Sequence, residues 1–383
     1  MELAGNWNYP TSIRFGAGRI AELGECCREL GMTRPLLVTD EGLADHAIVV
    51  DARGRCEGDG VPCALYADVA GNPTGAQVER GVRAFRAGGH DGVIAFGGGS
   101  ALDAGKAIAF LSVQTRPLWD FEDVGDNWLR ARTEGLPPVV AVPTTSGTGS
   151  EVGRASVITD PEQVAKKIIF HPRMLPEIAL SDPALTLSLP PRITAATGMD
   201  ALSHSMEAFF APAYHPMARG VGIEGMRLVK TWLPLAVADG SDLEARAHML
   251  AASQAGATAF QKGLGGMHAL AHSLGALYDA HHGTLNAVLM PYVLEANRVV
   301  IETDAGDLAR CLDLEPSFDA LLAWVLALRR EIGIPETLAG IGLEASEPDR
   351  VGAMAAVDPA AAGNPIPLSA SQYAALFERA VRG

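Results

Sequence analysis

Two segments, residues 200–204 and 268–282, constrain the fold of this chain most. Although far apart in the sequence, they carry an aspartate and three histidines that look like the ligands of one metal site. Asp200 and His204 are four positions apart, which on a helix places both side chains on one face, about 6 Å apart. His268 and His282 are fourteen positions apart, and fourteen helical residues would span roughly 21 Å. The chain must therefore turn between these two histidines, and Gly283 is a plausible helix end. Three imidazoles and one carboxylate suit iron or zinc better than magnesium or calcium, and such a site with a spare coordination position is typical of an enzyme.

Length, charge and cysteine content limit the class of protein. The 383 residues are enough for two domains with their own cores. A net charge of -15 argues against nucleic acid or an anionic membrane as the main partner, and no apolar run approaches the ~20 residues of a membrane-spanning helix. The first residues, MELAGNWNYPTSIRF, lack the pattern of a signal peptide. The five cysteines include no C-x-x-C pair, as expected of reduced thiols. We therefore expect a cytoplasmic protein.

The first half of the chain alternates strand and helix patterns. PLLVTD (35–40), GVIAFGGGS (92–100) and PPVVAVPTTSGTGS (137–150) each combine an apolar strand with a polar turn, and residues 76–89 have apolar side chains at helical spacing. Strand, helix and strand in this order imply a parallel sheet with helices on its faces. Such sheets bind ligands at the carboxyl ends of their strands, where these polar turns fall.

The pattern changes around DPALTLSLPPRIT (182–194). Beyond it the chain has Ala/Leu/Met-rich helical stretches and almost no strand pattern. We therefore expect an α/β domain over residues 1–184 and an all-helical domain over residues 185–383. Residues 351–372 have the loosest pattern, and we expect a loop there before one last helix.

Two turns rich in glycine and hydroxyl groups indicate a phosphate-bearing ligand. In GGGSALDAGKAIA (97–109) a glycine turn leads into a helix, whose free backbone N–H groups bind phosphate, and Ser100 can add a donor. PTTSGTGSEV (143–152) is a second such turn, and two of them suggest a dinucleotide. Neither is a G-x-G-x-x-G or P-loop motif, and a plain capped turn explains the first equally well. Asp40 ends a strand and suits the ribose hydroxyls of NAD while repelling a 2′-phosphate, although Asp-Glu-Gly is more often only a turn.

The second histidine segment also contains H-A-L-A-H (268–272), the spacing of a zinc-protease helix. Ala269 follows the first histidine, where such peptidases carry their glutamate base, so the peptidase interpretation is weak. His171 and His215 lie beside prolines in loop-like sequence and are assigned no role.

These segments resemble the iron-dependent alcohol dehydrogenase family, which includes lactaldehyde reductases, propanediol dehydrogenases and more distant glycerol dehydrogenases. The resemblance covers essentially the whole chain, and its most specific parts are ALSDPALTLSLPPRITAATGMDALSHSMEAF and GLGGMHALAHSLGALYDAHHG. It implies a dehydroquinate synthase-like fold, with an N-terminal dinucleotide-binding α/β domain, a C-terminal helical domain, an active site in the cleft between them, and homodimers or larger homo-oligomers. The sequence departs from common family patterns in PAYHPMARGVGIEGM and in NPIP, and both departures leave the substrate open.

The resemblance also implies roles for individual residues. The family binds a divalent metal, usually iron and sometimes zinc, at the positions of Asp200, His204, His268 and His282; its spacing selects His282 over His281. His272 matches a histidine near the nicotinamide and is a candidate proton shuttle. The positions matching the NAD site are Asp40, Asn72, Gly98, Gly99, Ser100, Asp103, Thr144, Thr145, Thr148, Lys166 and Leu185, where Lys166 is preferred to Lys167 by its distance from Asp182.

The expected activity is the NAD-linked interconversion of a small alcohol with its aldehyde or ketone. The metal would act as a Lewis acid that lowers the pKa of the alcohol, hydride would pass to the nicotinamide, and His272 with ribose hydroxyls would carry the proton. Alternatives on the same fold are a hydroxyacid–oxoacid transhydrogenase and a maleylacetate-type reductase. Dehydroquinate synthase is disfavoured, because the helical half lacks evident basic residues for a phosphorylated substrate. A regulatory metal- or nucleotide-binding protein without turnover is disfavoured by the ligand set and the proton shuttle.

Overall fold

The computed structural model describes residues 5–7 and 11–383, so the stretch considered for a signal peptide lies partly outside it. Contacts between Cα atoms divide the chain into two compact units. Unit 1 ends at Leu187 and leaves out Ser146–Thr148. Unit 2 consists of Ser146–Thr148 and Ser188–Gly383. Within the described residues, no helix is long and apolar enough to cross a membrane.

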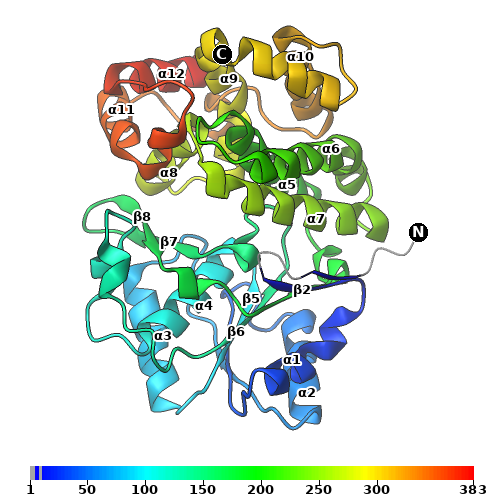
Figure 1. Ribbon diagram of the computed structural model, residues 1–383, viewed down its shortest axis with the longest axis vertical. Helices are drawn as coiled ribbons and strands as arrows, with labels where there is room; N and C mark the ends of the chain where they lie inside the picture. The colour runs from blue at the N-terminus through cyan, green and yellow to red at the C-terminus, as the bar shows by residue number, and fades with distance from the viewer. Residues whose placement is uncertain (1–4, 8–10) are drawn as a thin grey trace. The chain divides into compact units, whose positions relative to one another are not determined.

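Unit 1 is built on a seven-stranded sheet (Figure 1). In spatial order its strands are β1 (Gly5–Trp7), β2 (Ser12–Phe15), β9 (Ile178–Ser181), β6 (Val139–Pro143), β5 (Val93–Gly97), β3 (Leu36–Val38) and β4 (Ala64–Tyr66). Strand β1 pairs antiparallel with β2, and every other pair is parallel. The α/β class with a parallel sheet, predicted from the alternation of strands and helices, is confirmed.

The central strands bury side chains on both faces of this sheet. On β5, Val93 and Ala95 belong to one apolar cluster, and Ile94 and Phe96 belong to another. The first cluster includes residues of helices α3 (Gly75–Ala87) and α4 (Gly99–Leu111), and the second includes residues of α1 (Leu23–Glu29) and α2 (Ala47–Gly58). Strands covered on both faces need apolar side chains at every position, which explains their continuous apolar sequences.

The three polar turns predicted from the sequence follow neighbouring strands. β3, β5 and β6 are adjacent and parallel, so their carboxyl ends lie at one edge of the sheet. The backbone N–H of Thr144 donates to the carbonyl of Gly97 at 3.0 Å, which joins the turn after β6 to the end of β5. Strands β7 (Ala155–Asp160) and β8 (Ala165–Phe170) form a separate antiparallel pair that the sequence analysis did not predict.

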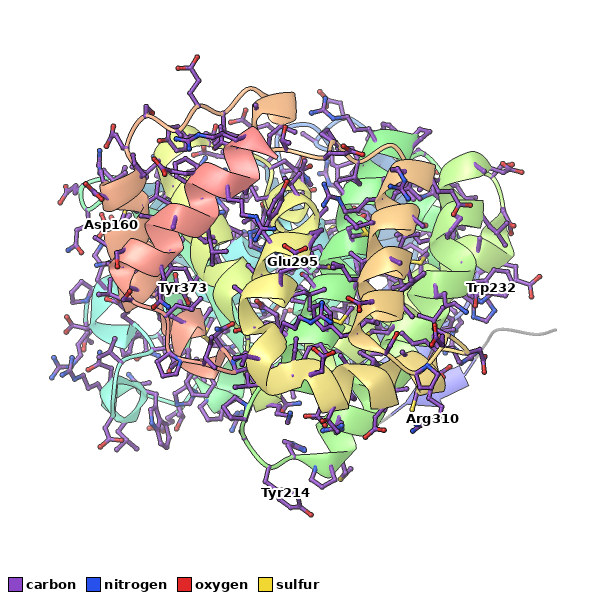
Figure 2. All side chains as sticks on the ribbon, turned by 90° about the horizontal axis from the view of Figure 1, so that it is seen from above. Asp160, Tyr214, Trp232, Glu295, Arg310 and Tyr373 are labelled. Atoms are coloured by element: carbon purple, nitrogen blue, oxygen red, sulfur yellow. The ribbon has the colours of Figure 1, made fainter. Side chains whose placement is uncertain are left out.

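Unit 2 contains only helices among its described residues. They are α5 (Pro191–Phe210), α6 (Pro216–Ala238), α7 (Leu243–Ala259), α8 (Gly266–Tyr278), α9 (His282–Cys311), α10 (Phe318–Glu331), α11 (Pro348–Val357) and α12 (Ala370–Arg382), with short 3-10 turns between some of them. One large apolar cluster joins them. Helix α12, which carries Tyr373, lies against α9, which carries Glu295 (Figure 2). Arg379 of α12 pairs with Glu295.

One prediction for unit 2 is wrong in part. A loop was expected over residues 351–372 before one last helix, and that helix is present as α12, but α11 occupies Pro348–Val357 and a 3-10 helix follows over Pro359–Gly363. The segment is rich in alanine and glycine, which weakens the apolar periodicity on which the prediction depended. Its helix is fixed instead by packing, because Val351 and Ala355 are fully buried in the unit's core.

Candidate metal centre and cofactor site

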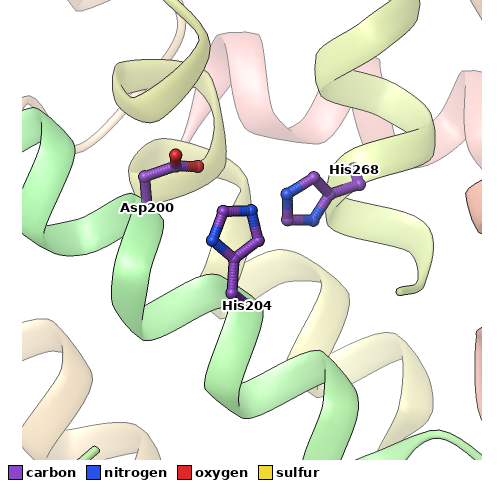
Figure 3. Close-up of side chains that lie close together, drawn as sticks. All are labelled: Asp200, His204 and His268. Atoms are coloured by element: carbon purple, nitrogen blue, oxygen red, sulfur yellow. The ribbon is translucent and has the colours of Figure 1, made fainter. Parts of the chain in front are cut away.

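Helix α5 carries the first two candidate metal ligands. The helix begins at Pro191, whose fixed φ angle suits the first turn of a helix. Asp200 and His204 lie one turn apart on it and are 3% and 4% exposed, so the predicted chelating pair shares one face of α5 (Figure 3). Burial lowers the pKa of His204 to about 4. Its imidazole is therefore neutral at neutral pH and keeps a lone pair, as a metal ligand must.

The third ligand comes from the first turn of α8. One ligand atom each from Asp200, His204 and His268 lie within 4.8 Å of one another, and the ring of His268 stacks on that of His204 with centroids 4.8 Å apart (Figure 3). The three side chains are all buried. They were selected from sequence spacing and family resemblance, and the fold brings them together.

The fourth predicted ligand, His282, opens helix α9. Its Nε2 lies 3.6 Å from Oδ1 of Asp200, and its ring centroid is 5.2 Å from that of His268. The expected turn between the two histidines is present, but it lies between Tyr278 and His282, before Gly283.

Position 283 is a glycine because of close helix packing and not because a helix ends there. A Cβ atom placed there would come within 2.4 Å of the carbonyl oxygen of Ala196 on α5. No side chain fits at that separation, so glycine allows α9 to approach α5 closely. This approach places His282 beside Asp200.

A buried carboxylate behind His268 was missed by the sequence analysis. Glu207 of α5 accepts hydrogen bonds from the backbone N–H groups of Gly265 (2.8 Å) and Met267 (2.7 Å) and from Nδ1 of His268 (2.6 Å). Because a carboxylate only accepts, the proton of the neutral ring is on Nδ1 and the Nε2 lone pair is left for a metal. Burial lowers the pKa of His268, but Glu207 outweighs it, so that the pKa is raised.

His272 has a similar carboxylate partner. It lies one turn beyond His268 on α8, and its Nδ1 is 3.0 Å from Oδ2 of Asp358. The ring of His272 stacks on that of His282 with centroids 5.4 Å apart. Asp358 fell within the segment expected to be a loop, so the sequence offered no signal for this pair. The carboxylate holds the proton on Nδ1 and leaves Nε2 as the atom available for proton exchange.

Several predicted NAD residues line the ends of the parallel strands in unit 1. Gly98 precedes helix α4, and a Cβ atom there would lie 3.3 Å from Cγ2 of Thr145. The hydroxyl of Ser100 donates to the carbonyl of Gly71 at 2.5 Å. Asp40 follows β3, and a Cβ atom on Gly97 would lie 3.3 Å from its Oδ2. A Cβ atom at Gly97 would also lie 2.7 Å from Cβ of Ala101, so these glycines allow close packing of the turns that carry the predicted NAD residues.

The two neighbouring lysines of β8 differ in their partners. Nζ of Lys166 donates to Oδ1 of Asn72 at 2.8 Å, so two of the predicted cofactor residues are in contact. Lys167 is buried and pairs instead with Asp160 at 3.1 Å and Glu122 at 3.6 Å.

Other predicted cofactor residues are held differently. Asp103 is 7% exposed and accepts hydrogen bonds from the hydroxyl of Ser150 at 2.5 Å and from the backbone N–H of Val157 at 2.9 Å. Its carboxylate therefore stabilises the segment that follows β6.

The remaining predicted cofactor residues have different surroundings. Leu185 belongs to one of the two apolar clusters of unit 1. Thr148 groups with unit 2 and the other predicted NAD residues with unit 1. Gly99 opens α4, and Thr144 is buried.

Two family profiles cover nearly the whole chain. The profile described as iron-containing alcohol dehydrogenase matches residues 10–183. The profile of the C-terminal part of the Fe-containing alcohol dehydrogenase family matches residues 194–381.

Individual relatives agree with these profiles over their full lengths. The chain is 39% identical to a 4-hydroxybutyrate dehydrogenase of Cupriavidus necator, with 97% of this chain and 99% of that protein covered. It is 36% identical to a 1,3-propanediol dehydrogenase of Klebsiella pneumoniae, with 96% of each covered. The crystal structure of a 1,3-propanediol oxidoreductase superposes with a TM-score of 0.91 at 34% identity, covering 99% of this chain and all of that one. The chain is therefore a member of the iron-containing alcohol dehydrogenase family and an alcohol oxidoreductase.

Proposed function

We propose that this protein interconverts a small primary alcohol and its aldehyde with NAD, at a divalent metal centre in unit 2. The observation that carries the proposal is the buried convergence of Asp200, His204 and His268 within 4.8 Å, with Nε2 of His282 3.6 Å from Asp200. A structural core has no need of such a set, because each buried polar group costs free energy unless it is paired.

The donor set fits iron or zinc. Three imidazoles and one carboxylate give ligands of intermediate softness, and Glu207 fixes the tautomer of one imidazole. When bound, the metal would act as a Lewis acid that polarises the oxygen of the alcohol or carbonyl group. All four candidate ligands lie on helices, which hold them more precisely than loops do.

His272 is suited to move the proton of the alcohol. Asp358 holds its Nδ1 at 3.0 Å, so Nε2 is free of that hydrogen bond and can accept a proton during oxidation and return it during reduction. Nδ1 keeps its proton throughout, so one defined ring atom carries out the exchange.

NAD is the proposed hydride carrier, and Asp40 is the basis for preferring it to NADP. Burial raises the pKa of Asp40, opposed by hydrogen bonds from the backbone, and its Oδ1 accepts from the N–H of Leu43 at 3.1 Å. A carboxylate held in place at the end of β3 can accept from both ribose hydroxyls but repels a 2′-phosphate.

The substrate class is inferred from the names of two relatives. One is a 4-hydroxybutyrate dehydrogenase and the other a 1,3-propanediol dehydrogenase, and both named substrates carry a terminal hydroxyl on a chain of three or four carbons. We infer that this protein acts on short primary alcohols with a second polar group at the far end.

The test is a substrate panel with the purified, metal-loaded protein. After anaerobic loading with Fe(II), or loading with Zn(II), the protein is mixed with NAD and 1-propanol, 1,3-propanediol or 4-hydroxybutyrate, and NADH formation is followed by absorbance. A chelator should abolish the rate and added metal should restore it. No NADH formation from any alcohol by metal-loaded protein would refute the proposal.

One alternative has an observation in its favour, because the similarity to a 4-hydroxybutyrate dehydrogenase suggests a hydroxy acid substrate. A hydroxyacid–oxoacid transhydrogenase would oxidise 4-hydroxybutyrate only with an oxoacid acceptor and would release no net NADH. Measuring aldehyde formation with and without 2-oxoglutarate, beside NADH release, separates the two reactions.

A further inference from the structure

One residue in contact with the candidate ligands has no role in the proposed function as described so far. Asn286 lies on α9 one turn beyond His282 and is completely buried. Its Nδ2 is 2.9 Å from Oδ1 of Asp200, 3.2 Å from Nε2 of His268 and 3.2 Å from Nε2 of His282. A single amide nitrogen thus contacts an atom of three of the four candidate ligands.

The other end of the same side chain is unusual. Among the described residues, no group hydrogen-bonds to the buried Oδ1 of Asn286. Buried amides normally satisfy both ends, and a leucine of similar volume would bury no polar atom. Packing therefore does not explain an asparagine here, whereas its N–H group makes a specific contact with the charged Asp200.

The chemistry of the amide group limits what Asn286 can do. An amide nitrogen donates hydrogen bonds and has no lone pair for a cation, so in this orientation it is not a metal ligand. A hydrogen bond from an amide to a carboxylate is charge-assisted and stronger than a neutral one. The contact at 2.9 Å therefore occupies Oδ1 of Asp200 and leaves Oδ2 available.

We propose that Asn286 is a positioning residue that holds Oδ1 of Asp200, so that the carboxylate binds the metal through Oδ2 alone. A carboxylate that binds through one oxygen leaves a coordination position for the substrate, as catalytic metal sites require. The close approach of α9 to α5 at Gly283 brings the amide within reach of Asp200. This inference rests on the proposed metal centre.

The test measures metal binding as well as catalysis. Zn(II) affinity is measured by competition with a chromophoric chelator, and the visible absorption of the Co(II)-loaded protein reports the coordination number. Asn286→Leu should weaken Zn(II) binding about 10–100-fold, the usual effect of removing a group that supports a ligand. It should also reduce the intensity of the Co(II) bands, because a freed carboxylate can bind through both oxygens and raise the coordination number.

A double-mutant cycle separates this role from general destabilisation. Protein that already carries Asp200→Ala keeps three imidazoles, and its weakened binding is measured by direct titration at high Zn(II) concentration. In that protein Asn286→Leu should change the Zn(II) affinity by no more than about twofold, because the carboxylate that it holds is gone. The matched control is Asn297→Leu on the same helix. Asn297 is also buried and pairs with Asn364 at 2.8–2.9 Å, so its loss should lower thermal stability but not Zn(II) affinity.

The outcomes that contradict the inference are specific. Wild-type affinity in Asn286→Leu, or an equal loss in Asn297→Leu, or fully additive effects in the cycle would each overturn the positioning role while leaving the metal centre intact. A wild-type protein that binds neither Zn(II) nor Co(II) would instead overturn the proposed metal centre itself, and the inference with it.

Discussion

Glu207→Gln tests whether the buried carboxylate behind His268 supports the metal centre. In the wild-type protein one carboxylate oxygen accepts from Gly265 and His268, and the other accepts from Met267. A glutamine has the same shape but only one acceptor oxygen. Its NH₂ group must therefore face at least one N–H donor, which is left buried without an acceptor.

The expected cost follows from these contacts. Leaving one buried donor unpaired costs roughly 1–3 kcal/mol, and the remaining bonds lose their charge assistance. We expect a loss of about 2–3 kcal/mol in the free energy of unfolding, and a metal affinity about 10–100-fold weaker because the ring of His268 is held less firmly.

The assay combines thermal unfolding with Zn(II) titration against a chromophoric chelator. Glu302→Gln is the control, because Glu302 is half exposed on α9, pairs with Arg298, and should shift stability by no more than about 0.5 kcal/mol. If Glu207→Gln bound Zn(II) as tightly as the wild-type protein and unfolded at the same temperature, the assignment of Glu207 as a support of His268 would be wrong.

Four further predictions concern single residues. His268→Ala should lose metal and activity together, as measured by metal analysis and NADH formation; stoichiometric metal in that variant would contradict the ligand assignment. His272→Ala should keep its metal and lose about 10²–10⁴-fold in kcat, with partial rescue by added imidazole, whereas an unchanged kcat would make His272 structural. Asp40→Gly should improve kcat/KM with NADP, and equal use of both cofactors by the unaltered protein would contradict the role of Asp40. Burial alone would raise the pKa of Asp160, but the hydrogen bond from Lys167 outweighs burial and the pKa is lowered. The ion pair should therefore stabilise the fold above pH ~4 and lose this effect as the pH falls further. The difference in Tm between the wild-type protein and Asp160→Asn should accordingly disappear in acid.

The parts of the fold that the sequence predicted are those decided by local pattern. Buried parallel strands such as β5 show unbroken apolar runs, and α3 shows clear helical spacing, because each element's own residues report its burial. The hairpin of β7 and β8 was missed because β7 (ASVITD) mixes polar with apolar residues and β8 (AKKIIF) begins with two lysines after one alanine, so neither shows an unbroken apolar run. Helix α11 was missed because alanine and glycine give little contrast between faces.

The candidate site likewise contains residues that local spacing predicted and residues that it did not. Asp200 and His204 share one face of one helix, so their spacing alone predicted that they would point together. Glu207 belongs to that helix too, but its partner His268 is 61 positions away, and Asp358 is 86 positions from His272. These supporting carboxylates depend on how α5, α8 and α11 pack, and residue spacing carries no information about such packing.

The grouping of the ligands into separate units has a thermodynamic consequence. All four candidate metal ligands belong to unit 2, whereas all the predicted NAD residues except Thr148 belong to unit 1. A ligand stabilises only the folded segment that binds it, by about 2.7 kcal/mol at a free concentration of 100 times its Kd. In a calorimeter, zinc should therefore raise chiefly the melting temperature of unit 2, and NAD chiefly that of unit 1. Heat capacity curves could then report metal loading and cofactor binding separately in a single unlabelled sample.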